Sequence, residues 1–273
     1  PVERIALTPG SSGAFVLGFL AAFEPGDRVA LATPCYPAYR NILTALGIEV
    51  VLVPADAGHG FQPTPELLRR AGPLDGLVIA SPANPTGTML GAADLAALCE
   101  WCRAAGVRLV SDEIYHGITY GPAATTALAF GDDAIIVNSF SKYFSMTGWR
   151  LGWMIVPPDM VRAIECLAQN LFISPPTLSQ HAAMAAFDCV PELEENVARY
   201  ARNRALLLAE LPKAGFDRLA PADGAFYIYA DVAHLTNDSS AFCRRMLEDV
   251  GVAATPGVDF DPERGDRSLR FSF

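Results

Sequence analysis

The sequence contains no run of basic residues, and its acidic residues outnumber its basic ones. Among 273 residues there are 30 aspartates and glutamates but only 20 lysines and arginines, so the formal net charge at pH 7 is −10. Nucleic acids and anionic membranes attract proteins through clustered positive charge, which is missing here. We therefore expect neither of them as a partner.

The sequence also has no apolar stretch long enough to cross a bilayer. The longest candidate, residues 14–23, is well short of the roughly 20 residues that a membrane-spanning helix needs. We expect it to form a buried helix. Because 51% of the residues are hydrophobic, the chain can build a large core, in one large domain or in two smaller ones.

The cysteines do not form a disulfide framework, because only six are scattered along a chain of this length. This predicts a cytoplasmic protein. Cys99 and Cys102 are spaced as C-x-x-C, but they lie inside the helical pattern of residues 91–105. A zinc site would need a second such pair or nearby histidines. We therefore assign this pair to helix packing and predict no metal site.

Common nucleotide and hydrolase motifs are missing. Neither G-x-G-x-x-G nor the Walker pattern occurs, so dinucleotides and nucleoside triphosphates are not indicated. There is no G-x-S-x-G, and the four histidines do not follow strand ends in a pattern that suits a Ser–His–Asp hydrolase. His116, beside Tyr115, is expected at the edge of a cleft without a catalytic role.

What the sequence does contain is an alternation of short β-rich runs with helical patterns. The expected strands are residues 4–8, 28–33, 49–53, 76–81, 107–112, 134–139 and 151–156, and the helical stretches between them include 12–23, 36–46, 64–71 and 91–105. Several strands are almost continuous in Val, Ile and Leu, as strands buried on both faces are. This pattern predicts an α/β fold with a mostly parallel, seven-stranded sheet sandwiched by helices.

The pattern changes after about residue 158. Three helical stretches (158–170, 176–187 and 191–212) precede a strand at 224–232 and a helix at 238–250. We expect a large domain over residues 1–188 and a smaller C-terminal α/β domain over 189–273, joined by a long helix. Because the sequence starts just before one strand-like segment and stops within another, we expect it to be part of a longer protein.

Polar or aromatic residues follow five of the expected strands. They occur in the segments TPGSSGAF (8–15), TPCYPAY (33–39), SPANPTG (81–87), SDEIYHG (111–117) and NSFSKYF (138–144). In open α/β sheets, ligands bind outside the carboxyl ends of the strands. We therefore expect these five segments to form one composite site.

Three of these segments allow a structural and a functional interpretation. At residues 8–15, backbone N–H groups and serine hydroxyls at a helix start could bind a phosphate, or Ser11 or Ser12 could simply cap the helix after a turn at Gly10. Asp112 is either a local cap or the partner of a buried cation. Asn84 lies in a turn whose following X-Pro bond is a candidate cis peptide, and its amide could also bind a ligand.

Lys142 and Arg150 lie in an apolar neighbourhood, with no acidic residue between them. An unpaired buried ammonium is costly, so such a lysine finds a partner or becomes a neutral amine, which is a nucleophile towards carbonyl groups. An imine-forming lysine, a phosphate cradle with an arginine, a buried aspartate and an aromatic residue in the segment CYP have one economical explanation. Together they would bind pyridoxal 5′-phosphate.

The motifs SPANPTG, SDEIY, SFSKYFSMTGWRLGW and LRFSF occur in this order along the chain. On these motifs, the sequence resembles the fold-type I pyridoxal-phosphate-dependent aminotransferases of classes I and II, from about residue 4 to 273. The resemblance implies exchange of an amino group between an α-amino acid and a 2-oxo acid by a ping-pong route, through a pyridoxal phosphate Schiff base on Lys142. It also implies a homodimer with the active site at the interface.

The resemblance further implies a role for each matching residue. Lys142 would also move the proton between Cα and C4′, Asp112 would pair with the pyridinium nitrogen, and Tyr115 and Asn84 would hydrogen-bond the 3′-oxygen. The other expected cofactor contacts are Tyr36 on the ring face and Gly10, Ser11, Ser12, Ser139, Ser141 and Arg150 at the phosphate. Arg270, together with Asn84, would bind the substrate by gripping its α-carboxylate.

The sequence departs from the family in one respect and leaves the substrate open. The resemblance implies a fragment without the N-terminal stretch of the small domain, which would include a tyrosine that reaches the neighbouring subunit's phosphate, and without the C-terminal tail after Phe273. Residues 167–180, which should approach the partner's site, contain no arginine or lysine, and this favours a neutral or apolar amino donor. Two alternatives use the same motifs: a pyridoxal-phosphate lyase (a C–S lyase or a cyclopropane-carboxylate-type enzyme) and a cofactor-binding sensor domain of a regulator.

Overall fold

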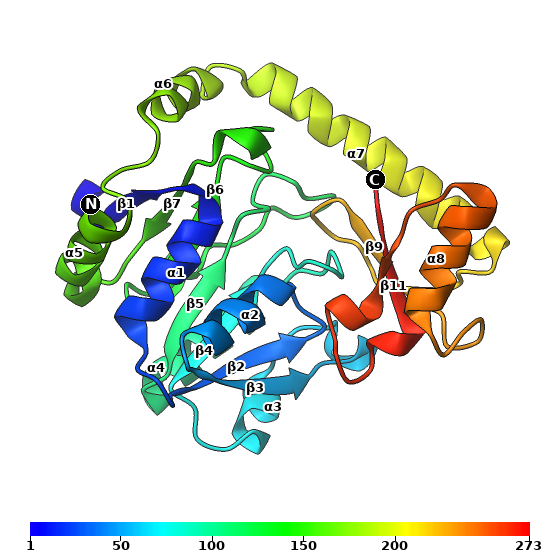
Figure 1. Cartoon of the computed structure of the whole chain (residues 1–273), viewed down its shortest axis with the longest axis horizontal. Helices are drawn as coiled ribbons and strands as arrows, with labels where there is room; N and C mark the ends of the chain where they lie inside the picture. The colour runs from blue at the N-terminus through cyan, green and yellow to red at the C-terminus, as the bar shows by residue number, and fades with distance from the viewer.

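The computed structural model describes all 273 residues and contains two β-sheets (Figure 1). The larger sheet has seven strands in the order β1-β7-β6-β5-β4-β2-β3. Only β7 runs against its neighbours, because it pairs antiparallel with both β1 and β6. The prediction of a mostly parallel, seven-stranded sheet is confirmed. The strands are β1 Ile5–Thr8, β2 Arg28–Thr33, β3 Glu49–Pro54, β4 Gly76–Ala80, β5 Arg108–Asp112, β6 Ile135–Ser139 and β7 Gly152–Ile155.

Helices cover both faces of the larger sheet, which explains why its strands are so apolar. On one face, α1 (Gly10–Ala22), α2 (Pro37–Ala45) and α5 (Val161–Leu171) pack around a core that includes Val78 of β4. On the other face, α3 (Pro65–Arg70) and α4 (Ala92–Ala105) pack around a core that includes Leu77 and Ile79 of the same strand. Successive strand residues point to opposite faces, so a central strand such as β4 contributes to both cores.

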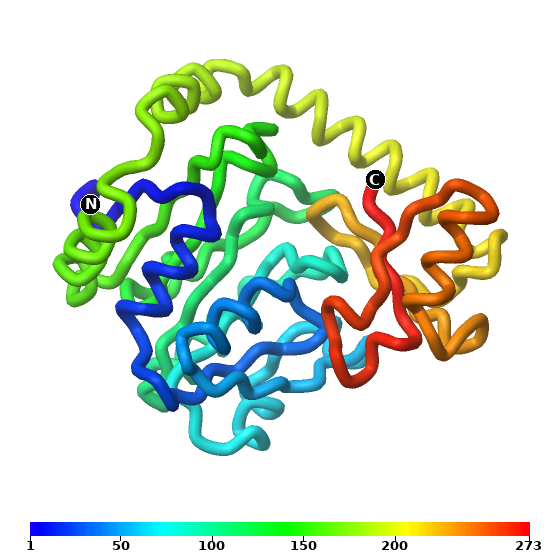
Figure 2. Tube along the Cα trace, in the orientation of Figure 1, coloured from blue at the N-terminus to red at the C-terminus, as the bar shows by residue number.

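The second sheet is smaller and wholly antiparallel, in the order β10-β11-β9-β8. Its strands are β8 Arg218–Leu219, β9 Tyr227–Asp231, β10 Thr255–Pro256 and β11 Ser268–Ser272. After α6 (Thr177–Ala186), the 21-residue helix α7 (Val190–Glu210) runs along the molecule to this sheet (Figures 1 and 2). Helix α8 (Ser239–Val250) packs on the second sheet and completes its core.

The main-sheet strands begin and end within one residue of the predicted bounds, whereas three other elements start differently. Helix α1 begins at Gly10, two residues earlier than predicted. Helix α5 begins at Val161, because residues 158–160 form a 3-10 turn that starts at a proline. Strand β9 begins at Tyr227 and not at residue 224. Residues 222–227 pass so close to Gly87 that a Cβ there would lie 2.9 Å from the Gly224 carbonyl oxygen.

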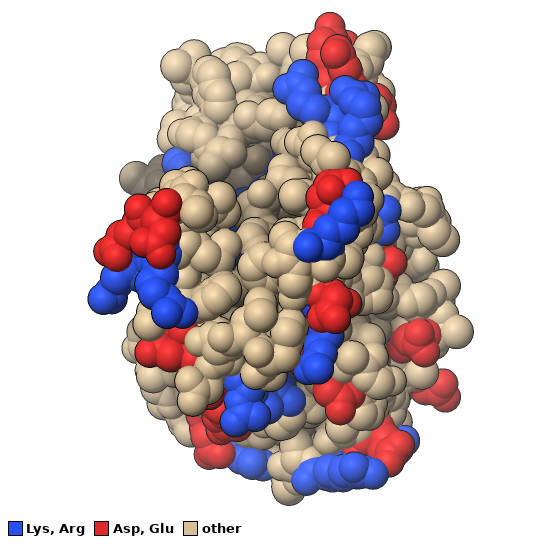
Figure 3. Space-filling model, turned by 90° about the vertical axis from the view of Figure 1, so that its right-hand side faces the viewer, with Lys and Arg blue, Asp and Glu red and all other residues tan.

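The C-x-x-C cysteines lie in the core, as predicted. Cys99 and Cys102 are both buried in α4 and belong to the core on that face of the sheet. No helix of the structure combines the length and the apolar character that crossing a membrane requires. On the face shown in Figure 3, basic and acidic side chains are interspersed, with no large basic area.

Candidate active site

The segments predicted to form one site do converge at one edge of the larger sheet. Asp112 ends β5 and Ser139 ends β6, while Asn84 follows β4 and Tyr36 follows β2. These strands run parallel, so their carboxyl ends lie together. The second sheet closes the site from the side, because Arg270 of β11 donates a hydrogen bond from Nη1 to Asn84 Oδ1 at 2.8 Å.

Lys142 has no ion-pair partner. Its Nζ lies 5.6 Å from the ring centres of both Tyr115 and Phe226. Burial in this aromatic setting lowers the pKa of Lys142, and the cations Arg270 and Arg150 lower it further, whereas Asp112 raises it. The amine is therefore available in its neutral, nucleophilic form at a lower pH than an ordinary lysine.

Asp112 is buried and does not form an ion pair with Lys142. Its Oδ2 accepts a hydrogen bond from the Tyr39 hydroxyl, and its Oδ1 accepts one from the backbone N–H of Ile114 at 3.1 Å. Burial raises the pKa of Asp112 to about 6, although both hydrogen bonds and Lys142 act in the opposite direction. Asp112 thus bonds locally to the backbone of the following segment, as in the first interpretation, and it forms no ion pair with a cation of this protein.

Sequence reasoning missed Tyr39. This residue lies one helical turn after Tyr36 in α2, and the two rings are 5.5 Å apart in an edge-to-face arrangement. Burial and the neighbouring Asp112 carboxylate raise the pKa of Tyr39 well above its usual value, so the phenol keeps its proton and donates to Asp112. The spacing Y-x-x-Y after a strand end was the available signal, because it puts both rings on one helix face.

A second missed pair is Tyr227, the first residue of β9, and Phe226 directly before it. The Tyr227 hydroxyl lies 2.7 Å from the hydroxyl of Tyr115, and Phe226 packs against the Tyr115 ring at 5.5 Å. Burial raises the pKa of Tyr115 well above its usual value. The predicted strand 224–232 carried both residues, but its sequence does not reveal that it meets the edge of the other sheet.

Arg270 is held in a fixed orientation, and one of its three guanidinium nitrogens has no partner. Its Nη2 donates to Thr255 Oγ1 at 3.1 Å, and the guanidinium lies 4.4 Å from the Tyr227 ring centre and 4.9 Å from that of Phe260. Its Nε is buried and has no partner in the protein. A buried donor without a partner is costly, and a bound carboxylate would satisfy it.

The start of α1 and the Arg150 guanidinium that lies against it form a positively charged cradle. No side chain caps this helix, so the interpretation of Ser11 or Ser12 as a cap is wrong. Gly10 has φ +72°, and a Cβ there would lie 2.3 Å from Arg150 Nη2, so only glycine lets the guanidinium lie over the helix start. The exposed N–H groups of the first helical turn and the arginine both favour an anion.

The remaining predicted phosphate contacts lie around this cradle with different exposure. Ser139 is buried, and its hydroxyl donates to Ser141 Oγ at 3.0 Å. Arg150 Nη1 donates to the Thr147 carbonyl at 3.0 Å and reaches Ser141 Oγ at 3.5 Å. Ser11 is half-buried and Ser12 is exposed on the first turn of α1. The cradle is thus preformed, with Arg150 tethered beside it.

The family model for aminotransferase class I and II matches the whole chain, residues 1–273. This chain belongs to the class I and II aminotransferases. A valine–pyruvate aminotransferase of Mycobacterium tuberculosis is 54% identical over 276 residues, a match that covers 99% of this chain and 71% of that protein.

Solved aminotransferase structures superpose closely on this chain. A putative aminotransferase from Silicibacter pomeroyi is 56% identical, with a TM-score of 0.98, over 100% of this chain and 74% of that one. An engineered aspartate aminotransferase of Thermus thermophilus is 32% identical, with a TM-score of 0.93, over 100% of this chain and 76% of that one. The predicted fold type is therefore confirmed.

Aminotransferases of this family use pyridoxal phosphate, and the residues present here fit that cofactor. The helix-start cradle under Arg150 suits a phosphate, and it would be filled by a Cβ at Gly10. A buried carboxylate at Asp112 and an amine without an ion-pair partner at Lys142 suit the ring nitrogen and the aldehyde. Each group is costly to keep in the empty protein, and the cofactor would supply its missing partner.

Proposed function

We propose that this aminotransferase transfers the amino group of a small aliphatic α-amino acid to a 2-oxo acid, at the site built around Lys142. The observation that carries the proposal is the position of Lys142: an amine without a counter-charge, desolvated by aromatic rings, with a lowered pKa. Such an amine attacks carbonyl groups, and it can accept a proton.

The residues that we propose to hold the cofactor are those that the family resemblance implies. Its phosphate would bind the cradle of Gly10, Ser11, Ser12, Ser139, Ser141 and Arg150. Its ring would lie between Tyr36 and the floor of the site, with the ring nitrogen at Asp112 and the 3′-oxygen at Asn84 and Tyr115. When bound, the cofactor withdraws electrons from the substrate's α-carbon and so makes its proton acidic.

The protein's own residues then bind, orient and move the proton. Arg270 would grip the α-carboxylate with the planar guanidinium, using the Nε donor that is otherwise unpaired. Lys142 Nζ would take the proton from the substrate's Cα and deliver it to C4′ of the cofactor, and it would reverse this transfer in the other half-reaction. Asp112, supported by the phenol of Tyr39, would keep a negative charge at the ring nitrogen.

The choice of a small aliphatic donor has two supports. The relative that shares 54% of its residues with this chain is named valine–pyruvate aminotransferase, and residues 167–180 offer no cation for a second substrate carboxylate. The lyase alternative is not favoured, because the similar proteins are named aminotransferases, including those that use aspartate. The same names argue against a regulator's sensor domain.

A donor panel tests this proposal. Purified protein loaded with pyridoxal phosphate is given each amino acid with pyruvate or 2-oxoglutarate, and the new amino acid is quantified. We expect valine or another small aliphatic donor to give the highest kcat/KM and aspartate to be at least about tenfold poorer, since an unpaired carboxylate costs more than 1.4 kcal/mol to bury. A preference for aspartate would refute the proposed donor class.

Arg270→Lys is predicted to weaken substrate binding. Lysine keeps the charge but loses the planar pair of donors, so kcat/KM should fall about 100-fold, or about 2.7 kcal/mol, mainly through KM. The matched control is Arg267→Lys. Arg267 lies three residues before Arg270, but its side chain is 64% exposed to solvent. Equal effects of the two substitutions on steady-state kinetics would contradict the role of Arg270.

We further propose a homodimer. Large apolar side chains are exposed on α5, α6 and the loop between them, including Leu171 (53%), Ile173 (82%), Leu178 (72%) and Met184 (70%). A cluster of this kind marks an interaction surface, and the family resemblance points to a second copy.

Sedimentation should show a dimer that Ile173→Asp converts to a monomer. The control Val250→Asp should leave the dimer intact, because Val250 is a similarly exposed apolar residue on α8. A monomeric wild type would refute this.

Two further assignments complete the proposal. The domain boundary falls at residues 188/189, which separates the larger sheet with its helices from α7 and the second sheet. All six cysteines are free, and this supports a reducing, cytoplasmic location.

A further inference from the structure

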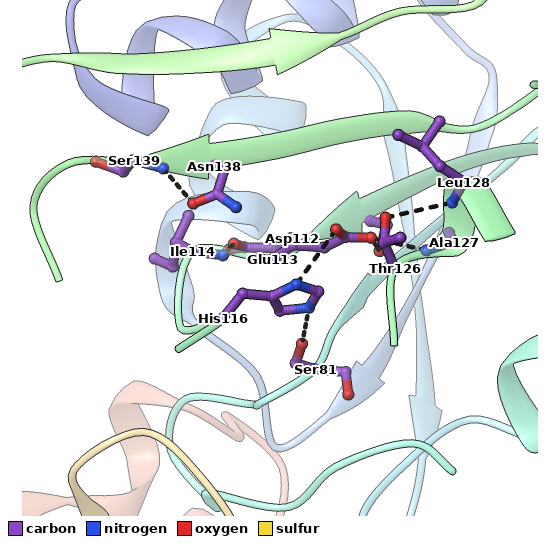
Figure 4. Close-up of polar contacts among 11 residues, drawn as sticks. Ser81, Asp112, Glu113, Ile114, His116, Thr126, Ala127, Leu128, Asn138 and Ser139 are labelled. Carbon is purple, nitrogen blue, oxygen red and sulfur yellow. Dashed lines mark hydrogen bonds and ion pairs between the residues drawn. The ribbon is translucent and has the colours of Figure 1, made fainter. Parts of the chain in front are cut away.

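Glu113 is a buried carboxylate that none of the proposed chemical steps uses. It follows Asp112 directly, but its side chain points away from the site (Figure 4). Its Oε1 accepts hydrogen bonds from the hydroxyl of Ser111 at 3.1 Å and from the backbone N–H of Ala127 at 2.9 Å. Its Oε2 lies 3.6 Å from Nδ1 of His116.

His116 joins this carboxylate to a different loop. Its Nε2 lies 3.1 Å from the backbone carbonyl oxygen of Ser81 (Figure 4). A carbonyl only accepts hydrogen bonds, so Nε2 carries the hydrogen and donates it. The backbone of Ser81 forms a second hydrogen bond to the end of β5, from its N–H to the carbonyl oxygen of Asp112 at 3.2 Å. The imidazole therefore spans the gap between the end of β5 and the loop that begins at Ser81.

The loop held in this way carries Asn84. It is closed on itself, since Gly87 N–H donates to the Ala83 carbonyl at 2.8 Å and Leu90 N–H donates to Ser81 Oγ at 2.9 Å. A shift of its base at Ser81 is thus transmitted to Asn84. Asn84 Oδ1 in turn accepts the hydrogen bond from Arg270 Nη1.

We propose that His116 is a positioning residue for substrate binding. Its imidazole, which lies beside Glu113, fixes the Ser81 carbonyl, and through the closed loop it fixes Asn84 and the orientation of the Arg270 guanidinium. The inference rests on the proposed role of Arg270 in binding the substrate carboxylate. His116 touches neither the reacting atoms nor Arg270, so its effect falls on substrate affinity and leaves the proton transfers at Lys142 unchanged.

The test compares three variants of the full chain. His116→Ala removes both contacts, whereas His116→Gln retains an amide donor that can reach the Ser81 carbonyl. The control is His59→Ala, because His59 forms the same kind of i,i+3 pair with Asp56, at 2.7 Å, outside the site. Hydrogen–deuterium exchange of residues 81–90 is measured without cofactor. KM and kcat are then measured on the loaded enzyme, with the best donor of the wild type.

We expect His116→Ala to speed exchange in residues 81–90 and to raise KM for donor and acceptor about fivefold to tenfold, the effect of one lost hydrogen bond, with kcat within about twofold. His116→Gln should restore most of both, and His59→Ala should change neither. Unchanged exchange, or faster exchange with unchanged KM, overturns the proposal. If His116→Ala speeds exchange but Arg270→Lys leaves KM unchanged, the proposed role of Arg270 in binding substrate is wrong.

Discussion

Replacing Lys142 with alanine will abolish transamination while leaving the fold intact. The substitution removes both the amine that would hold the cofactor and the base that would move the proton. General-base catalysis alone contributes up to about 10^4-fold, so we expect kcat to fall by at least about 10^4-fold in a coupled assay. Removing a desolvated cation from an aromatic pocket should also leave the thermal stability of the empty protein unchanged or higher.

Lys213→Ala is the matched control for this experiment. The chain has only two lysines, Lys142 and Lys213, and Lys213 is 69% exposed, next to Glu210. Its removal should leave kcat unchanged. If Lys142→Ala retained more than about 1% of the wild-type rate, or if both substitutions reduced the rate equally, Lys142 would not be the catalytic amine.

Asp112→Asn will lower activity and change the pH dependence of stability. A negative charge close to the ring nitrogen is worth about 4 kcal/mol at an effective dielectric constant near 20, so kcat/KM should fall about a thousandfold. The fall should appear in kcat more than in KM, because the charge matters most when electrons move into the ring.

Asp112→Asn lowers activity, but at neutral pH it should not lower the stability of the empty protein. In the empty protein the pKa of Asp112 is raised from 3.8 to about 6, so the folded state binds a proton more tightly than the unfolded state. The stabilising contribution is present below about pH 4 and is lost as the pH rises to about 6. Between pH 4.5 and pH 7 the wild type should therefore lose about 2 kcal/mol of unfolding free energy relative to Asp112→Asn, as measured by urea denaturation. Parallel curves for the two proteins would contradict a pKa of Asp112 that burial has raised.

Much of the fold was predictable because each strand of the larger sheet is an apolar run between turn residues. The same regularity located Asp112 and Asn84, since polar residues at the carboxyl ends of parallel strands meet at one edge. The family motifs added the expected role of Arg270, which lies on another sheet.

The missed residues depend on contacts that no local pattern reveals. From the sequence, Tyr39 is an ordinary packed residue of α2. Its hydrogen bond to Asp112 forms because β4 lies between β2 and β5 in the sheet, which brings α2 close to the end of β5. Tyr227 reaches Tyr115 across the two sheets. The alternative interpretation of Ser11 or Ser12 as a helix cap failed for a similar reason: the helix start at Gly10 is covered by Arg150, a residue far away in the sequence.

The most direct test of this account is to find which residue carries the cofactor. The loaded protein is reduced with borohydride, digested, and its peptides are weighed by mass spectrometry. With two lysines in the chain, the outcome is unambiguous. We predict one reduced cofactor on the peptide that contains Lys142, and none on this peptide after an amino donor has been added before reduction. Label on Lys213, or no label on either lysine, would contradict the assignment of this site.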